Sequence, residues 1–455
     1  MGTNPSEKCV AVGFGQAIIT PDFPVELTGY GNNSTRISTS VLSDLCVHIL
    51  AFQDADGNRA LVITADLMLI SSAWTEELAQ WCEENVGVPA DNLIFSAVHQ
   101  HSTPYLQEEK MDAMGRPRIH AAIKAAIADL SPAEMYIARV ETQAMNFVRH
   151  YWNAEGEIVT PNHNKPTGGL VGHESEADNV IQLLKFKRSG KKDILVVNFQ
   201  THPYMGTGGF KTEITSDWVG VLRDQVSQQL NCDVCYFSGA GGNVADGSMI
   251  KAERVSVDYL DHGRRAAEYI LSAEGTYEKV SGGSVKAKRM VVTYEADHSM
   301  DHLVDIARPI RDEFLEGDFL KAKEMAEETP EIFSIYHARS IISKSEAPRT
   351  KDMPIMAVSI GDVAFTGHPY EMFDTNGMEL KNGTVGNENY FPEEQMENPY
   401  KMTIVATIAN GYNSYIPSRM GYTNGGYSTD TALFAPGSGE RIVADYLKIL
   451  NELHS

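Results

Sequence analysis

One stretch of the sequence reads Asn92-Leu93-Ile94-Phe95-Ser96-Ala97-Val98-His99-Gln100-His101-Ser102-Thr103-Pro104. Its apolar first half predicts a short β-strand, which Pro104 prevents from continuing. Because side chains alternate along extended backbone, His99 and His101 are expected on one face of this strand. Two imidazoles at a strand end suit a divalent metal, or one metal ligand beside an acid–base group. Two partly exposed histidines without a chemical role are the alternative interpretation.

The segments before and after this stretch alternate between strand-like and helical patterns. Apolar runs at 47–52 and 60–66 flank an Asp56-Gly57 turn signal and predict a hairpin. Apolar residues recur at helical spacing in Ser72–Val86 and again at 119–130. Strands and helices in this alternation predict an α/β fold of mixed β-sheets layered with helices.

The rest of the chain repeats these patterns without a linker or a tandem repeat, so we expect a single domain over residues 1–455. The expected strands lie at 134–139, 180–186, 194–199, 234–237, 354–360, 362–366 and 402–408. The expected helices lie at 217–230, with Ser216-Asp217 as its cap, and at 255–271 and 442–453. A charged helical region at about 298–348 interrupts the pattern. It is interpreted as a helical insertion, either a lid or an ordinary surface pair of helices.

Composition excludes several classes of partner. Acidic residues outnumber basic ones by 61 to 38, and the formal net charge is -23. Such a charge argues against nucleic acid as a partner. No apolar run approaches the length needed to span a membrane, so no integral membrane segment is expected. Residues 1–8 lack a signal sequence, and the five sparse cysteines suggest reduced thiols, which together predict a cytoplasmic protein.

Other predicted strands also end in residues that can bind metal or transfer protons. His202 follows the strand at 194–199, Glu371 follows the strand at 362–366, and Tyr412 and Tyr415 follow the strand at 402–408. In open α/β sheets, loops at one edge of the strands form the binding site. Two or three imidazoles and one carboxylate suit a catalytic zinc ion. Taken singly, each residue also fits a packed histidine, an ordinary carboxylate or a core tyrosine.

Several blocks of the sequence resemble, in the same order, motifs of the neutral, non-lysosomal ceramidases, which are zinc-dependent amidases that cleave N-acyl sphingosine. The blocks are Val12-Gly13-Phe14-Gly15, Val98-His99-Gln100-His101-Ser102-Thr103-Pro104 (T-H-T-H-S-G-P in the family), Asn198-Phe199-Gln200-Thr201-His202-Pro203, Pro369-Tyr370-Glu371-Met372-Phe373 (P-G-E-P-F), Asn410-Gly411-Tyr412-Asn413-Ser414-Tyr415 and Gly425-Gly426-Tyr427. The resemblance covers most of the chain and implies a ceramidase-like catalytic domain.

The resemblance also implies a set of site residues. It assigns one Zn²⁺ ion to four ligands, His99, His202, Glu371 and Tyr415. It places His101 within hydrogen-bonding reach of the reacting centre. It further gives active-site roles to Arg149 and Tyr427.

One loop departs from the family pattern. The family motif G-D-V-S-P-N is here Gly242-Asn243-Val244-Ala245-Asp246-Gly247, so Ala245 replaces a serine that contributes to catalysis, and Ser248 is out of register. Water activated by the metal is therefore the expected nucleophile, with Asp246 as a candidate base. The chain ends soon after the catalytic motifs, so no C-terminal β-sandwich is expected.

These observations predict a zinc-dependent hydrolase that cleaves the amide bond of an N-acyl or other small-molecule substrate. A metal-dependent esterase or phosphoesterase acting on a small polar substrate is the alternative enzyme. A non-catalytic, metal-binding pseudo-enzyme that lost activity with the serine is the third interpretation.

Overall fold

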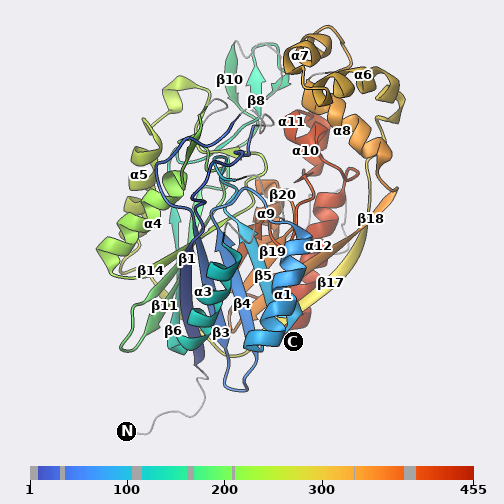
Figure 1. Cartoon of the computed structure of the whole chain (residues 1–455). Coiled ribbons are helices and arrows are strands. Elements are labelled where there is room, and N and C mark those ends of the chain that lie inside the picture. Colours follow the sequence, from blue (N-terminus) through green and yellow to red (C-terminus); the bar gives the residue numbers. More distant parts are fainter. Residues whose placement is uncertain are drawn as a thin grey trace, which may run out of the picture.

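The computed structural model describes residues 9–30, 36–104, 115–160, 169–207, 211–332, 334–383 and 396–455 (Figure 1). Sheets and helices alternate along the chain, as expected for the α/β class. Residues 1–8, on which part of the localisation prediction depends, lie outside the described residues.

The largest element is a mixed sheet with eight strands in one continuous order and β16 (Glu278–Val280) paired to β6. The continuous order is β14 (Asp233–Ser238), β12 (Ile194–Phe199), β11 (Val180–Arg188), β6 (Ser131–Glu141), β1 (Val10–Ile18), β3 (Cys46–Gln53), β4 (Arg59–Ala65) and β5 (Leu93–Ala97). β4 runs parallel to β5, and β12 runs parallel to β14. β1 and β6 pair over three residues only, Val10–Val12 with Ser131–Ala133.

A second, four-stranded sheet faces the first. Its strands are β17 (Val285–Glu295), β18 (Thr350–Ile360), β19 (Val363–His368) and β21 (Met402–Thr407). Short pairs of strands complete the fold, namely β15 (Val244–Ala245) with β7 (Phe147–Val148), β20 (Glu371–Met372) with β22 (Tyr415–Ile416), β13 (Glu213–Ile214) with β2 (Ser40–Val41), and β8 (Tyr151–Asn153) with β9 (Ile158–Val159) and β10 (Leu170–His173).

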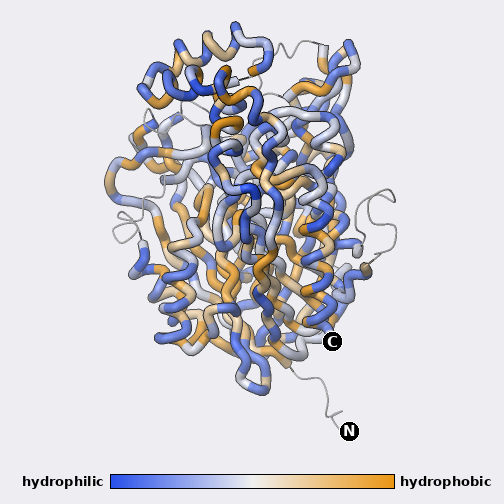
Figure 2. Tube along the Cα trace, turned by 90° about the vertical axis from the view of Figure 1, so that its right-hand side faces the viewer, coloured by the Kyte–Doolittle hydropathy of each residue, from blue (hydrophilic) through white to orange (hydrophobic). Residues whose placement is uncertain are grey.

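One apolar core joins the two sheets. Phe52 comes from one half of the large sheet, Phe237 from the other half, and Phe365 from the four-stranded sheet. The ring centroid of Phe365 lies 6.0 Å from that of Phe52 and 5.9 Å from that of Phe237. Hydrophobic stretches run through the part of the molecule that the sheets occupy (Figure 2). Burial of this apolar surface is the main force that holds the sheets together.

Helices cover the outer faces of both sheets. α1 (Ser72–Val86) and α3 (Arg116–Ala128) pack on one half of the large sheet, α4 (Asp217–Leu230) and α5 (Tyr259–Ser272) on the other half, and α9 (Asp374–Asn382) and α12 (Ser438–His454) on the four-stranded sheet. The apolar stripe of each helix faces the sheet, as amphipathic spacing predicts.

The ends of three strands from distant parts of the chain meet above the central core. After β14, the Ser238 hydroxyl donates a hydrogen bond to the Val98 carbonyl beyond β5, with 2.6 Å between the oxygens. At the end of β21, Thr407 Oγ1 donates to the Gly239 carbonyl at 2.9 Å. These bonds place the histidine pair, the glycine-rich loop and the tyrosine-rich segment next to one another.

The charged region between β17 and β18 is helical, as predicted. It forms η4 (Asp301–Leu303), α6 (Val304–Leu315), α7 (Phe319–Glu327) and α8 (Ile335–Glu346), which share a small apolar core of their own. The helices lie at one end of the molecule, next to α10 (Arg419–Asn424) and α11 (Tyr427–Asp430) (Figure 1).

Two local predictions were wrong. The helix expected at 255–271 begins only at Tyr259, because the Asp258 carboxylate accepts a hydrogen bond from the Asp261 amide and caps the helix there. The Ser216 side chain was expected to cap α4, but its hydroxyl contacts Ser43 instead and makes no capping bond.

The described part of the chain holds no helix that is both long and apolar enough to cross a bilayer. The five cysteines are free, in agreement with the expected thiols. Cys235 lies within β14 and Cys232 directly before it, so the Cys-x-x-Cys spacing belongs to a strand.

Candidate metal centre

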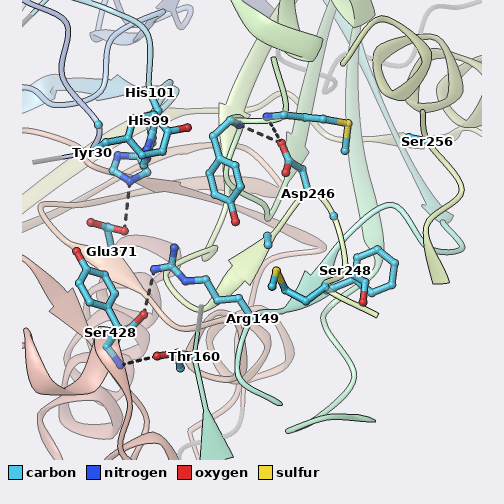
Figure 3. Close-up of a pocket in the computed structure, with 18 of the residues that line it drawn as sticks. Tyr30, His99, His101, Arg149, Thr160, Asp246, Ser248, Ser256, Glu371 and Ser428 are labelled. Atoms are coloured by element: carbon cyan, nitrogen blue, oxygen red, sulfur yellow. Dashed lines mark hydrogen bonds and ion pairs between the residues drawn. The ribbon is translucent and has the colours of Figure 1, made fainter. Parts of the chain in front are cut away.

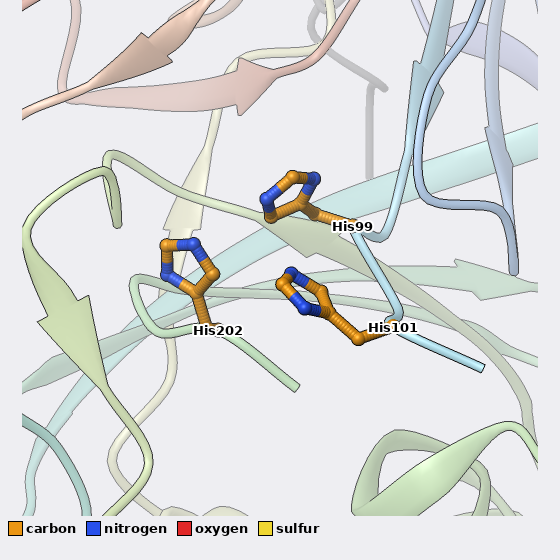
Figure 4. Close-up of side chains that lie close together, drawn as sticks. All are labelled: His99, His101 and His202. Atoms are coloured by element: carbon orange, nitrogen blue, oxygen red, sulfur yellow. The ribbon is translucent and has the colours of Figure 1, made fainter. Parts of the chain in front are cut away.

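Three histidines converge above the strand ends. The ring centroid of His99 lies 5.0 Å from that of His101 and 4.8 Å from that of His202. One nitrogen from each ring can be chosen so that all three lie within 4.8 Å of one another, and all three residues are buried. Figure 4 shows His99 and His101 reaching this point from one loop and His202 from another.

The route by which the histidine pair converges differs from the prediction. Strand β5 ends at Ala97, and His99 has a φ of 67°, in the left-handed region. The pair therefore does not share one face of a strand. A non-glycine residue in this conformation is uncommon and occurs often at functional sites. The turn at His99 allows both rings to face the same space.

A carboxylate completes the cluster. Glu371 lies in β20, and its Oε2 atom is 3.2 Å from His99 Nε2 and 3.1 Å from His202 Nε2. The side chain is only 4% exposed. Although burial raises the pKa of Glu371, the neighbouring His99 and His202 hold it well below its usual range. Glu371 is therefore ionised at neutral pH.

The tautomers of two histidines follow from their outer hydrogen bonds. His99 Nδ1 lies 2.9 Å from the Met68 carbonyl, and His202 Nδ1 lies 2.8 Å from the Val244 carbonyl. A carbonyl oxygen only accepts, so each Nδ1 carries a proton, and in the neutral form of each ring the lone pair lies on Nε2. Both lone pairs thus face Glu371 Oε2, which is also an acceptor. A divalent cation between these atoms would remove the repulsion, and a histidine ligand fixed by a carbonyl is the usual arrangement around zinc.

His101 has no outer partner of this kind. Both of its ring nitrogens are buried and lack a hydrogen-bond partner among the described residues. Burial, followed by the electrostatic effect of the neighbouring His99 and His202, lowers the pKa of His101 well below its usual range. His101 is thus a neutral imidazole whose two nitrogens are available to a metal or a substrate. Buried polar atoms without a hydrogen-bond partner are rare in native structures and often mark a binding or catalytic role.

Two tyrosines reach the cluster, and sequence reasoning could not rank them. The Tyr412 hydroxyl donates a hydrogen bond to Glu371 Oε1 at 2.9 Å. Tyr415 lies opposite Glu371 in the β20–β22 pair, and its hydroxyl oxygen is 3.1 Å from Arg149 Nη2. Burial raises the pKa of both phenols well above 10. The contact of Tyr412 with Glu371 is a feature that the sequence-based assignment missed.

Arg149 follows β7 and is held by the glycine-rich loop. Its Nη2 atom donates to the Gly242 carbonyl at 2.8 Å and to the Ser428 hydroxyl at 3.0 Å, and its guanidinium carbon lies 5.6 Å from the ring centroid of Tyr415 (Figure 3). Burial lowers the pKa of Arg149, but Tyr415 and other nearby acidic groups raise it above the usual value. Arg149 therefore remains a cation inside the cavity, although it is only 6% exposed.

Asp246 lies in the wall of the same cavity. Its Oδ2 atom accepts hydrogen bonds from the amides of Tyr204 at 3.0 Å and Met205 at 2.8 Å. Burial, then the charge of Asp217, raises the pKa of Asp246 well above its usual range. Ala245, the residue before it, bridges the backbone of His202 and presents only a methyl group to the cavity.

One cavity of about 460 Å³ connects these residues. Seven of the eight predicted site residues line it, namely His99, His101, Arg149, Asp246, Glu371, Tyr415 and Tyr427. The eighth, His202, contacts the cluster through Glu371. Tyr30, Tyr151 and Tyr204 also line the cavity, and no motif in the sequence pointed to them.

The helical insertion contacts this site. Tyr336 of α8 packs edge-on against Tyr427, with 5.9 Å between ring centroids, and its hydroxyl donates to the Tyr30 carbonyl at 2.9 Å. Burial raises the pKa of Tyr427 to about 12, so this phenol keeps its proton at neutral pH. The insertion is thus packed against two residues of the cavity wall.

Comparison with known proteins gives no match to a protein-family model and none to a curated protein sequence. Solved structures do match. A neutral ceramidase from Pseudomonas aeruginosa aligns over 98% of this chain and 75% of its own, with a TM-score of 0.72 and 17% identity. The chain has a ceramidase-like fold. A ceramidase complexed with C2 aligns equally well, over 98% and 76% of the two chains, with a TM-score of 0.71 and 16% identity.

The likeness confirms the predicted fold class, an α/β body like that of a ceramidase catalytic domain. At these identities it shows the fold alone. Family membership, the four metal ligands and the replacement of the family's catalytic serine by Ala245 remain predictions that rest on the sequence motifs.

Proposed function

We propose that this protein is a metal-dependent hydrolase, with zinc as the metal, that cleaves the amide bond of a small N-acyl substrate. The observation that carries the proposal is the convergence of two Nε2 atoms, from His99 and His202, on the ionised carboxylate of Glu371, with each Nδ1 held by a backbone carbonyl. Tyr415 would complete the ligand set. When bound at such a site, zinc polarises a carbonyl and lowers the pKa of water to about 7.

The residues around the cluster would stabilise the reacting carbonyl. Arg149 stays positively charged, and Tyr427 keeps a proton that it can donate to an oxygen on which negative charge develops. His101 has a free nitrogen for the same purpose. Removing one such donor from a water-poor site typically costs about a hundredfold in rate.

Asp246 would hold and return a proton during the reaction. A carboxylate that accepts a proton from water and gives it to a leaving amine works best when its pKa is raised toward neutrality. Burial and Asp217 shift the pKa of Asp246 in that direction. Ala245 offers no nucleophile, so the proposal needs no acyl-enzyme.

The choice of an amide is supported by the fold, since both matching structures are described as ceramidases. The same residues would also stabilise an ester or phosphate ester. Turnover of matched N-acyl amides, carboxyl esters and phosphate esters by the purified protein separates these reactions. Faster hydrolysis of the amide supports the proposal, and hydrolysis of the ester or phosphate ester alone contradicts it.

Metal content tests the site independently of turnover. We expect about one zinc ion per chain by elemental analysis of the wild type, and a large loss of zinc and of amide hydrolysis in His99→Ala and His202→Ala. His302→Ala, which removes an exposed histidine of the insertion, is the matched control and should change neither value. Full metal content in both cluster variants would contradict the ligand assignment, and stoichiometric zinc without turnover of any acyl substrate would indicate a pseudo-enzyme.

A further inference from the structure

One part of the cavity wall has no role in the proposed chemistry. It lies between β15 and α5, and we call it the rim segment (residues 247–257). The rim residues that line the cavity are Gly247, Ser248, Met249, Arg254, Val255, Ser256 and Val257. The late start of α5 leaves the end of this segment outside the helix. The rim segment therefore contacts whatever fills the cavity outside the candidate metal centre.

Arg254 is the cation of the rim segment that lines the cavity, whereas Lys251 does not line it. The residue is exposed, lines the cavity, and its Nε atom donates to the Ser248 carbonyl at 2.5 Å. This bond fixes the plane of the guanidinium, and its terminal nitrogens make no hydrogen bond to any residue that the structure describes. Arg254 forms no ion pair with any residue that the structure describes.

The adjacent carboxylate is engaged elsewhere. Glu253 Oε2 lies 2.7 Å from His173 Nε2 and 2.6 Å from the Ser248 hydroxyl. Burial raises the pKa of Glu253, but these hydrogen bonds outweigh that effect and lower it. Glu253 is therefore held by His173 and Ser248 and leaves the positive charge of Arg254 available to a ligand.

The cavity is lined by more positive charge than the acidic composition of the chain would suggest. The chain has a net charge of -23, yet two arginines, Arg149 and Arg254, line one cavity of about 460 Å³. The metal would add further positive charge. Of the carboxylates that line the cavity, Glu371 faces the histidines, and Asp246 accepts hydrogen bonds from the amides of Tyr204 and Met205. A cavity with this balance attracts anions and disfavours cations.

We propose that Arg254 binds an anionic group of the substrate, so that the preferred substrate is an N-acyl amide bearing a carboxylate or a phosphate. This inference rests on the proposed amide hydrolysis and adds the substrate class to it. The guanidinium presents parallel N–H donors that match either anion. Met249 and Val255, exposed by 38% and 40%, lie in the same rim segment and can cover apolar parts of the substrate.

The test compares the wild type with Arg254→Gln on three amides that share one acyl group: an N-acyl glycine, an N-acyl phosphoethanolamine and the neutral N-acyl propylamine. We expect the variant to lose about tenfold in kcat/KM on at least one anionic amide, as hydrogen bonds to charged groups predict. The neutral amide should change less than about twofold. If kcat/KM falls on the N-acyl glycine, Arg254 binds a carboxylate, and if it falls on the N-acyl phosphoethanolamine, Arg254 binds a phosphate.

Lys251→Gln is the matched control, because Lys251 is an exposed cation three positions away that does not line the cavity. It should alter none of the three rates. Equal losses on charged and neutral amides in Arg254→Gln, or equal losses in both variants, would overturn the inference and leave the proposed hydrolysis intact.

Measuring the binding of the anionic amides tests the anion site at Arg254 separately from the proposed hydrolysis. If no amide is hydrolysed, the proposed function fails, and titration of N-acyl glycine and N-acyl phosphoethanolamine into the zinc-loaded protein still tests Arg254. About tenfold weaker binding of either anion by Arg254→Gln than by the wild type supports the anion site. Unchanged binding of both overturns it.

Discussion

His99 and His202 reach the same tautomer for the same reason, because each donates Nδ1–H to a backbone carbonyl of a neighbouring loop. The sequence pattern predicted histidines at strand ends, but it could not show the left-handed turn at His99 or the hydrogen bond of its ring to the Met68 carbonyl, 31 residues earlier in the chain. The sequence likewise could not distinguish Tyr412 from Tyr415. In the structure the Tyr412 hydroxyl contacts Glu371 and the Tyr415 hydroxyl contacts Arg149.

The two tyrosines lead to a prediction at this scale. If Tyr415 is a metal ligand and Tyr412 only supports Glu371, Tyr415→Phe should reduce the zinc content more than Tyr412→Phe. Loss of a partner outside the ligand set typically costs about 10- to 100-fold in metal affinity or activity. Competition with a chelator of known affinity measures both variants. The reverse order would make Tyr412 the ligand and contradict the assignment implied by the ceramidase motifs.

Most helices and strands were predictable because each has one apolar face that must be buried. α1 spans Ser72–Val86 as predicted, since Trp74, Leu78 and Cys82 form a stripe that packs on the large sheet. Element ends were less predictable. The helix predicted from residue 255 begins only after the cap at Asp258, so Val255, Ser256 and Val257 lie in the cavity wall instead of in a helix.

The contact between α4 and α5 predicts an acid-sensitive part of the fold. His262 of α5 is fully buried and packs against Trp218 of α4, with 5.1 Å between ring centroids. Burial lowers the pKa of His262 to about 3. In the unfolded chain its pKa is about 6.5. Its contribution to stability is therefore complete above about pH 6.5 and is lost as the pH falls toward 3.

Because His262 gains a proton in the unfolded chain but not in the folded one, we expect the free energy of unfolding to fall by about 2 kcal/mol between pH 7 and pH 5. Urea unfolding at the two pH values measures the loss, and His262→Gln should reduce the pH dependence by about that amount. His302→Gln, at an exposed position, should retain the wild-type slope. An unchanged slope in His262→Gln would show that this residue is not held neutral in the folded state.

At the scale of the molecule, the fold brings a site together from segments more than 300 residues apart in sequence, such as those of His99 and Tyr415. The α/β class and the order of the motifs followed from the sequence. The short β1–β6 pairing and the meeting of Ser238 with Val98 did not, because strand periodicity carries no information about which strands pair or which strand ends meet.

The shared core gives a prediction for the whole molecule. Phe365 is fully buried and touches both halves of the large sheet through Phe52 and Phe237. Phe365→Ala should lower the free energy of unfolding by about 3–5 kcal/mol, the usual cost of a large cavity in a core. Phe319→Ala, at a position that is 40% exposed on the insertion, should cost far less. Similar losses in chemical denaturation of the two variants would contradict the central role of this core.

The central claim is that His99, His202 and Glu371 hold one metal ion together. Anomalous diffraction at the zinc edge, from crystals of the zinc-loaded wild type, tests it most directly. We predict one strong peak among His99 Nε2, His202 Nε2 and the Glu371 carboxylate, with the Tyr415 hydroxyl beside it. A zinc peak elsewhere in the molecule, or none in crystals grown with excess zinc, would contradict the claim.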